Sequence, residues 1–352
     1  MKIAFLSFYS GEVYRGVETF VHELGNRLVK MGHEVVIYQN GPQLVGANYK
    51  TVSMGLKIDY KRPNTYVSFI NYYGRKVGSF IVKVLKEIDK DTNIIFPTNG
   101  QWQALLCRLW AKVHKAKVVI SGQSGPGLDD RINLWTFPDR FVALTSHQRN
   151  WAKRANPFVR IEKIPNGVDL TKFNDKVKPI SLDLPRPVIL SVGALDSWKR
   201  LDLAIKAVSR LENASLLLVG RGPQEAQLRK LGKKLLPKRF KIMSFPYSQM
   251  PGVYKVADIF TYPTVPWESF GIALVEAMAS GLPVVVTNDP IRKEIVGRAG
   301  VLVNPKDTAS YSIALENALK LRWGRRPLNQ AKKFNWDKIA LKYERLFSEL
   351  VK

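Results

Sequence analysis

Two glutamates lie eight positions apart in an otherwise apolar segment, WESFGIALVEAMASGLPVVVT, which spans residues 267–287. Glu268 comes just before a helix that is expected to begin near Phe270, and Glu276 lies about two turns into that helix. Helical side chains lean toward the helix N-terminus, so both carboxylates should lie at that end. A buried acid without a partner is costly, which indicates that Glu276 binds a ligand. The alternative is that Glu268 is a loop acid and Glu276 a solvated helix position.

The start of this helix is also suited to an anion. The backbone N–H groups of Phe270, Gly271 and Ile272 are expected to have no helical partners, and the helix dipole adds positive potential there. Gly271 allows a close approach, and Ser269 is expected to cap the helix. Carboxylates accept charge-assisted hydrogen bonds from vicinal hydroxyls. A phosphate site flanked by two carboxylates therefore fits a nucleotide-sugar, in which a ribose, a diphosphate and a sugar follow one another.

Strands and helices alternate along the chain that must position these groups. Residues 2–8 read as a buried strand, residues 18–31 as a helix and residues 33–39 as a second strand, which makes a βαβ unit. The same alternation restarts after the segment DKVKPISLDLPRP (175–187), which is predicted to be a linker. We expect an α/β fold with two doubly wound, mainly parallel sheets. Ligands bind beyond the carboxyl ends of such strands, so the motifs should face a cleft between two domains.

The chain has 352 residues and a net charge of +26, which favours anionic partners such as nucleic acid, acidic lipids or phosphorylated small molecules. Its single cysteine, Cys107, excludes an internal disulfide and a Cys-rich metal site, is expected to be buried, and fits a reducing cytoplasm. The N-terminal apolar run is too short for a secretory signal, and no window approaches the ~20 apolar residues of a membrane span. The protein is expected to be soluble or to lie on a membrane surface.

One helix near residues 75–86 combines basic and apolar side chains in a pattern that suits an anionic membrane interface. The alternative is an ordinary surface helix packed on its sheet. The basic and apolar residues of this helix are Arg75, Lys76, Lys83 and Lys86, and Val77, Phe80, Ile81, Val84 and Leu85.

The segment ESFGIALVEAMASGLPVV resembles the E-x7-E signature of the retaining glycosyltransferases of family 4, whose two-domain Rossmann-like fold is called GT-B. Other segments agree with this family. They are RGVE (15–18, like a G-G-x-E loop), IPNGVD (164–169), LSVGALDSWKRLDLAIKAV (190–208), LVGRGP (218–223) and the closing helix FNWDKIALKYERLF (334–347). The resemblance implies an acceptor-binding domain over residues 1–175, a donor-binding domain over 176–328, and a C-terminal helix over 329–352 that crosses back to the first domain.

The resemblance also assigns roles to residues. Glu276 would bind the ribose hydroxyls of the donor, Glu268 would contact the transferred sugar, and Lys199 would meet the diphosphate, which makes Glu268 and Lys199 the catalytic candidates. The remaining donor-binding candidates are the amide of Gly16, the base-side residues Gly222 and Phe245, and Arg200, Ser269, Phe270, Gly271 and Ile272. Glu18 is expected to cap its own helix.

Two positions depart from the family pattern. Ala194 stands where an arginine is usual, and Arg200 or Arg221 is a candidate to replace its positive charge. The segment SGQSGPGLDD (121–130) lacks a histidine that is often present near the sugar. The acceptor-side candidates are therefore Gln123, Asp129, with the neighbouring Asp130, and His147. A solvated helix start is the alternative for the aspartates, and a structural role is the alternative for the histidine.

The sequence thus predicts transfer of a hexose, with retention, from a UDP-, GDP- or ADP-sugar to a hydroxyl of a glycan or lipid-linked acceptor, as in polysaccharide biosynthesis. No cofactor and no metal are expected, because no DxD-type cluster is present and Lys199 with the helix N-terminus must hold the leaving diphosphate. The expected location is the cytoplasm, with the inner face of the membrane as a peripheral site. The alternatives are an epimerase or phosphorylase of similar fold, a basic nucleic-acid-binding protein, and a donor-binding homologue without activity; no nucleic-acid-binding module is apparent.

Overall fold

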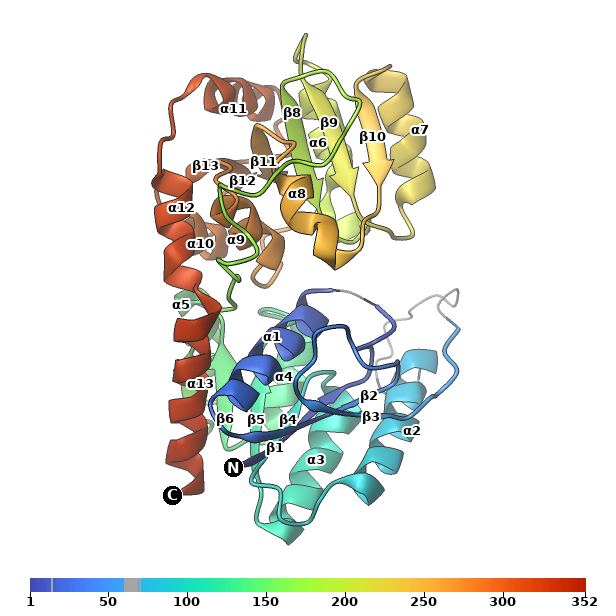
Figure 1. The fold of residues 1–352 in the computed structure, drawn as a ribbon, viewed down its shortest axis with the longest axis vertical. Coiled ribbons are helices and arrows are strands. Elements are labelled where there is room, and N and C mark those ends of the chain that lie inside the picture. Colours follow the sequence, from blue (N-terminus) through green and yellow to red (C-terminus); the bar gives the residue numbers. More distant parts are fainter. Residues whose placement is uncertain (14, 60–68, 70) are drawn as a thin grey trace. The chain divides into compact units, whose positions relative to one another are not determined.

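The computed structural model describes residues 1–13, 15–59, 69 and 71–352. The chain forms two compact units: the first is coloured from blue to green in Figure 1 and also includes the red helix at the C-terminus, and the second runs from green to red. Unit 1 comprises Met1–Pro165 and Asp337–Lys352, and unit 2 comprises Asn166–Trp336. Every helix in the described residues is too short or too polar to span a lipid bilayer.

In the described part of unit 1, seven parallel strands form one sheet in the order β3-β2-β1-β4-β5-β6-β7. The winding direction reverses between β1 and β4. The strands are β1 (Lys2–Ser7), β2 (Glu34–Gln39), β3 (Lys50–Ser53), β4 (Ile94–Pro97), β5 (Lys117–Ser121), β6 (Arg140–Ala143) and β7 (Ile161–Lys163). The helices are α1 (Gly16–Lys30), α2 (Tyr72–Glu87), α3 (Gln101–His114), α4 (Leu128–Trp135), α5 (Ser146–Ala155) and α13 (Trp336–Val351).

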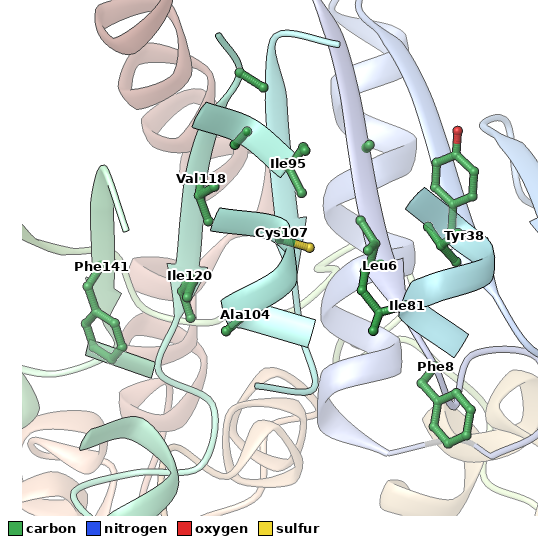
Figure 2. Close-up of a cluster of buried hydrophobic side chains, with 14 of the residues drawn as sticks. Leu6, Phe8, Tyr38, Ile81, Ile95, Ala104, Cys107, Val118, Ile120 and Phe141 are labelled. Atoms are coloured by element: carbon green, nitrogen blue, oxygen red, sulfur yellow. The ribbon is translucent and has the colours of Figure 1, made fainter. Parts of the chain in front are cut away.

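One face of this sheet is covered by α2 to α5. Side chains alternate between the two faces of a strand, so Ala4, Leu6 and Phe8 point to this face. They join buried residues of α2 and α3, among them Ile81 and Cys107, in the cluster that Figure 2 shows. The expectation that Cys107 is a buried core residue is confirmed.

The opposite face of the same sheet is covered by α1 and α13. The ring of Tyr343 in α13 lies 5.7 Å from that of Phe20 in α1 and 6.1 Å from that of Phe96 in β4. Phe347 packs one turn further along, with its ring 6.2 Å from that of Phe96. The last helix of the chain is therefore part of the core of unit 1, although it follows unit 2 in the sequence.

In the described part of unit 2, six parallel strands form a sheet in the order β10-β9-β8-β11-β12-β13. The strands are β8 (Val188–Val192), β9 (Ser215–Val219), β10 (Phe240–Met243), β11 (Ile259–Tyr262), β12 (Val284–Thr287) and β13 (Gly300–Val303). The α-helices are α6 (Leu201–Val208), α7 (Glu225–Leu235), α8 (Met250–Tyr254), α9 (Ile272–Ala279), α10 (Pro290–Val296), α11 (Thr308–Lys320) and α12 (Arg326–Ala331), and the 3-10 turns are η1 (Ser197–Lys199), η2 (Tyr247–Gln249) and η3 (Lys332–Phe334). This is the strand order of a Rossmann fold. The predicted pair of doubly wound parallel sheets is confirmed.

The chain enters and leaves unit 2 at one place. Val168 donates its N–H to the carbonyl of Phe334 at 2.8 Å, and Trp336 donates to the carbonyl of Val168 at 3.2 Å. Gly167 lies against the indole of Trp336, where a Cβ would come within 2.5 Å of a ring atom. These contacts place the start of unit 2 at Asn166, so the segment 175–187 that reads as a linker in the sequence lies inside unit 2.

Replacing Tyr343 by alanine is expected to destabilise unit 1 by about 3–5 kcal/mol, because the ring is fully buried among three phenylalanines and its loss leaves a cavity. Urea unfolding followed by circular dichroism measures this loss. Leu341→Ala on the same helix is the control, because Leu341 is 46% exposed and should change stability by less than about 0.5 kcal/mol. Equal stability of the two variants would contradict the packing of α13 on unit 1.

Candidate active site

The sheet of unit 2 reverses its winding direction between β8 and β11, and a crevice for ligands is expected beyond the carboxyl ends of these two strands. The loop after β8 leads into η1, whose last residue is Lys199. The loop after β11 carries Glu268 and leads into α9. The two catalytic candidates of the sequence therefore come from neighbouring strands at the expected point of the fold.

Lys199 and Glu268 form an ion pair. The ammonium Nζ lies 2.8 Å from the carboxylate Oε1, and the two side chains are only 11% and 17% exposed. Tyr262, the last residue of β11, lies between them: it accepts a hydrogen bond from Lys199 at 2.8 Å and donates a longer one, of 3.4 Å, to Glu268. No pattern in the sequence pointed to Tyr262.

The environment keeps this lysine charged. Burial opposes the charge of the ammonium group, but Tyr262 and the Glu268 carboxylate outweigh it and raise the pKa of Lys199 above its ordinary value. Burial also raises the pKa of Tyr262, and Glu268 adds to this effect, so the phenol stays neutral. At physiological pH Lys199 is thus a cation and Tyr262 a neutral hydroxyl.

Glu276 lies inside α9 and is only 5% exposed. The hydroxyl of Tyr254 donates to its Oε2 at 2.8 Å, and the hydroxyl of Tyr247 donates to its Oε1 at 3.1 Å. The buried Glu276 therefore does not require a ligand, because two tyrosines already satisfy the carboxylate. Its assignment to the ribose hydroxyls stays a prediction.

The start of α9 differs from the expectation by two residues. The helix begins at Ile272, and its N-cap is Gly271, which has a φ of +80° and provides no side-chain cap. The prediction that Ser269 caps the helix is wrong, because the chain turns into the helix only after this left-handed glycine. A Cβ on Gly271 would also lie 2.9 Å from the ring of Tyr262. Phe270, whose amide was assigned to the phosphate, buries its ring against Phe334, with 5.7 Å between the ring centroids.

A fully buried arginine holds the loop that carries Glu268. Arg292 of α10 pairs with Asp289 at 2.7 Å, and it donates to the backbone carbonyls of Val265, Pro266 and Glu268 at 3.1, 3.0 and 2.6 Å. Asp289 also caps α10 through the N–H groups of Ile291 and Arg292. The guanidinium thus binds three carbonyls of one four-residue turn from the buried side of the turn. No pattern in the sequence pointed to this residue.

The other donor-side candidates lie in loops at the same edge of the sheet. Arg200 has a φ of +49°, and its guanidinium hydrogen-bonds Asp202 at 3.2 Å. Arg221, the other candidate for the missing charge, donates to the hydroxyl of Ser244 at 3.0 Å. Gly222 touches the backbone of Leu195, where a Cβ would come within 2.6 Å of an oxygen, so packing of two loops alone explains the glycine.

Phe245 is half-buried and follows β10 at the same carboxyl edge, directly after Ser244. The loops after β8, β9, β10 and β11 thus bring Lys199, Gly222, Phe245 and Glu268 to one edge of the sheet of unit 2.

In unit 1, the candidates lie in loops at the carboxyl edge of its own sheet. Gly16 is exposed at the first residue of α1, where Glu18 accepts a hydrogen bond from the N–H of Arg15 at 3.1 Å. The expected capping role of Glu18 is confirmed. Gln123 donates to the hydroxyl of Ser121 at 2.9 Å, directly after β5.

The remaining acceptor-side candidates divide into exposed and buried groups. Asp129 and His147 are exposed in the first turns of α4 and α5. The neighbouring Asp130 is buried and accepts hydrogen bonds from Gly125 N–H and from Gln148, each at 3.0 Å. Burial raises the pKa of Asp130 to about 8. Asp130 therefore holds the loop after β5 together, while Asp129 and His147 face solvent.

Two family models cover most of the chain. Residues 14–172 match the model for Glycosyltransferase Family 4, and residues 172–335 match the model for Glycosyl transferases group 1. The chain is a glycosyltransferase. A phosphatidyl-myo-inositol mannosyltransferase of Mycolicibacterium smegmatis is 27% identical to it over an alignment of 374 residues. The alignment covers 99% of this glycosyltransferase and 93% of that protein.

Solved structures agree on the fold of the glycosyltransferase. The sucrose-phosphate synthase of Thermosynechococcus elongatus matches it with a TM-score of 0.80 at 19% identity, over 99% of this chain and 98% of the other. Anabaena HepE in complex with UDP-glucose matches it with a TM-score of 0.78 at 17% identity, over 99% and 100% of the two chains. The fold is GT-B, as the sequence predicts.

Replacing Arg292 by methionine is expected to destabilise unit 2 of the glycosyltransferase by about 3–5 kcal/mol, because Asp289 would keep a buried charge without its partner. Urea unfolding measures the loss. Lys293→Met removes the next, exposed cation on α10 and is expected to be nearly neutral. A stability change for Arg292→Met as small as that of Lys293→Met would show that the buried pair does not hold the turn.

Proposed function

We propose that this glycosyltransferase transfers a hexose, with retention at the anomeric carbon, from a nucleoside-diphosphate sugar to a hydroxyl of a glycan or lipid-linked acceptor. The observation that carries the proposal is the Lys199–Glu268 pair at the carboxyl ends of β8 and β11, with Gly271 and the start of α9 beside it. Two relatives support it: one is named for transfer of mannose to a phosphatidylinositol, and another was solved with UDP-glucose bound.

Each residue has a part in the proposed reaction. Lys199 is permanently charged and neutralises the diphosphate as it leaves, and the amides at the start of α9 add positive potential. Glu268 accepts hydrogen bonds from hydroxyls of the transferred sugar, and Glu276 accepts from the ribose. The departing phosphate oxygen takes the proton of the attacking hydroxyl on the same face of the sugar. The residues of the site thus bind and orient, and no side-chain base is required.

The proposed reaction needs no metal ion. Among the described residues, no three His, Cys, Asp or Glu side chains gather in a group that would hold one. Lys199 would supply the positive charge at the diphosphate, and the structure places its ammonium within 2.8 Å of two oxygen atoms, which are those of Tyr262 and Glu268. A diphosphate oxygen would take the place of one of them.

The single variants Glu268→Gln and Lys199→Met are each expected to lower kcat by roughly 10²–10³, because each removes a charge that stabilises the transition state. Nucleoside diphosphate release from a panel of UDP-, GDP- and ADP-sugars, with and without EDTA, measures turnover, and NMR of the product reports the anomeric configuration.

The matched control for these variants is the exposed ion pair between Lys320 and Glu316 on α11, whose nitrogen–oxygen distance is 2.6 Å. Lys320→Met and Glu316→Gln should leave turnover unchanged. Full activity of Glu268→Gln, an inverted product, or complete loss of activity in EDTA would each contradict a part of the proposed mechanism. Salt-sensitive binding to DNA without turnover of any nucleotide-sugar would favour the nucleic-acid-binding alternative.

We further propose that the enzyme works on the inner face of an anionic membrane, which it contacts through the outer surface of α2 and α3. The apolar residues of α2 that the sequence suggested for this contact pack on the core instead: Val77, Phe80, Ile81 and Val84 are buried, and Leu85 is partly buried against them. The neighbouring helix α3 instead exposes Leu109 and Val113, which are 52% and 76% exposed.

The same two helices carry exposed basic residues. They are Arg75, Lys83 and Lys86 on α2 and Lys112 and Lys115 at the end of α3, all exposed. Each Lys or Arg near an anionic lipid surface contributes about 1 kcal/mol to binding. The exposed apolar side chains of α3 add the burial of hydrophobic surface. Together these two contributions suit a peripheral membrane contact.

Leu109→Glu combined with Val113→Glu is expected to weaken binding to phosphatidylserine-containing vesicles at least about tenfold, because it adds two anions and removes the apolar contact. Vesicle co-sedimentation at low and high salt measures this. Leu321→Glu, at a residue of unit 2 that is 50% exposed, is the control. Equal binding of the double variant and the wild type, or equal binding to neutral phosphatidylcholine vesicles, would refute the proposed surface.

A further inference from the structure

Two exposed tryptophans stand beside the Lys199–Glu268 pair. Trp198 directly precedes Lys199 and is 47% exposed, and Trp267 directly precedes Glu268 and is 62% exposed. The charged side chains next to them are far less exposed, at 11% and 17%. This reverses the usual arrangement, in which aromatic rings are buried and charges face water. Both indoles thus leave a large part of their surface available for a ligand beside the ion pair.

The backbone that carries the two tryptophans is held in place. Glu268 donates its N–H to the carbonyl of Val265 at 3.2 Å, which closes a turn with Trp267 near its tip. Val265 in turn donates to the carbonyl of Trp198 at 2.9 Å, which joins the loop after β8 to the loop after β11. Arg292 binds the carbonyls of the turn on its buried side. The two partly exposed tryptophans therefore belong to loops that are hydrogen-bonded to each other.

We propose that Trp198 and Trp267 form a contact surface for a pyranose ring at the Lys199–Glu268 pair, an inference that rests on the proposed function. A pyranose has hydroxyls around its rim and C–H groups on its faces. An indole covers such an apolar face at a low cost in conformational entropy, since the side chain has only two rotatable bonds. Glu268 accepts hydrogen bonds from the rim hydroxyls, and Lys199 neutralises an adjacent phosphate.

The pyranose ring that stacks on the two indoles is either the sugar of the donor or a sugar of the acceptor, which have the same chemistry. Binding sites for small ligands combine aromatic walls with a few fixed polar groups, and this corner of unit 2 supplies both. The aromatic surface orients the ring while the ion pair provides the polar contacts. In either case Trp198 and Trp267 are binding residues that touch substrate.

The experiment compares Trp198→Ala and Trp267→Ala with the wild type. Isothermal titration measures the affinity for the nucleotide-sugar that the wild type turns over and for the matching nucleoside diphosphate without its sugar. Steady-state kinetics measure KM for a soluble acceptor. If the donor sugar stacks, affinity for the nucleotide-sugar falls about fivefold to tenfold while affinity for the diphosphate is unchanged. If the acceptor sugar stacks, its KM rises by a similar factor while donor affinity is unchanged.

Two controls keep the result interpretable. Trp267→Phe retains an aromatic face and is expected to recover most of the binding that Trp267→Ala loses. Ile313→Ala, at a residue of α11 that is 58% exposed, should change neither affinity nor KM. Thermal melting confirms that each variant is folded.

The inference is overturned if both alanine variants keep donor affinity and acceptor KM within twofold of the wild type. It is also overturned if they weaken the diphosphate and the nucleotide-sugar equally, because the effect would then not involve the sugar. Failure of the wild type to bind any nucleotide-sugar is a separate result, which would refute the proposed function itself.

Discussion

The ion pair between Lys199 and Glu268 joins the two loops at the point where the sheet of unit 2 changes its winding direction. Both side chains are nearly buried, so each charge depends on the other to remain in place. Tyr262 is the neutral group that bridges them. An anionic ligand that binds Lys199 has to compete with Glu268 for it. Under the proposed reaction, that competition frees the carboxylate for the hydroxyls of the sugar.

The residues around this pair are fixed by groups that are not part of it. Arg292 holds the turn that carries Glu268, and the pair of Arg292 with Asp289 also caps α10. Two tyrosine hydroxyls hold Glu276 in α9. The carboxylates of this region thus keep their positions through neutral hydroxyls and one buried cation. Such support makes the site rigid before any ligand arrives, which lowers the entropy lost on binding.

The sequence predicted the parts of this site that are local in the chain. The order of strand, turn and helix around Glu268 and Glu276 can be read from apolar periodicity and glycine positions, and the structure has that order. The predicted start of α9 was two residues too early, because the pattern of polar residues does not reveal the left-handed conformation of Gly271. The edge strand β3 was not predicted, because its positions are only exposed or half-buried and it therefore lacks an apolar run.

The partners of the site residues could not be predicted in the same way. Tyr262 meets Lys199 across 63 positions of sequence, and Arg292 meets Glu268 across 24. Each looks ordinary in its own segment, as a strand residue and as a basic helix residue. Only the pairing of β8 with β11 and the packing of α10 behind the turn bring them to the site. A single sequence carries no signal for contacts that depend on the whole sheet.

The position of α13 has a consequence for how the chain is made. Unit 2 is continuous, whereas unit 1 is split between Met1–Pro165 and Asp337–Lys352. A ribosome therefore delivers all strands of both sheets before it delivers Tyr343 and Phe347, which cover Phe20 and Phe96. Until the last helix emerges, one aromatic face of the first sheet stays open to water and to other chains. Termination of synthesis just before α13 would thus yield a complete second unit and a first unit with an exposed aromatic face that is prone to aggregate.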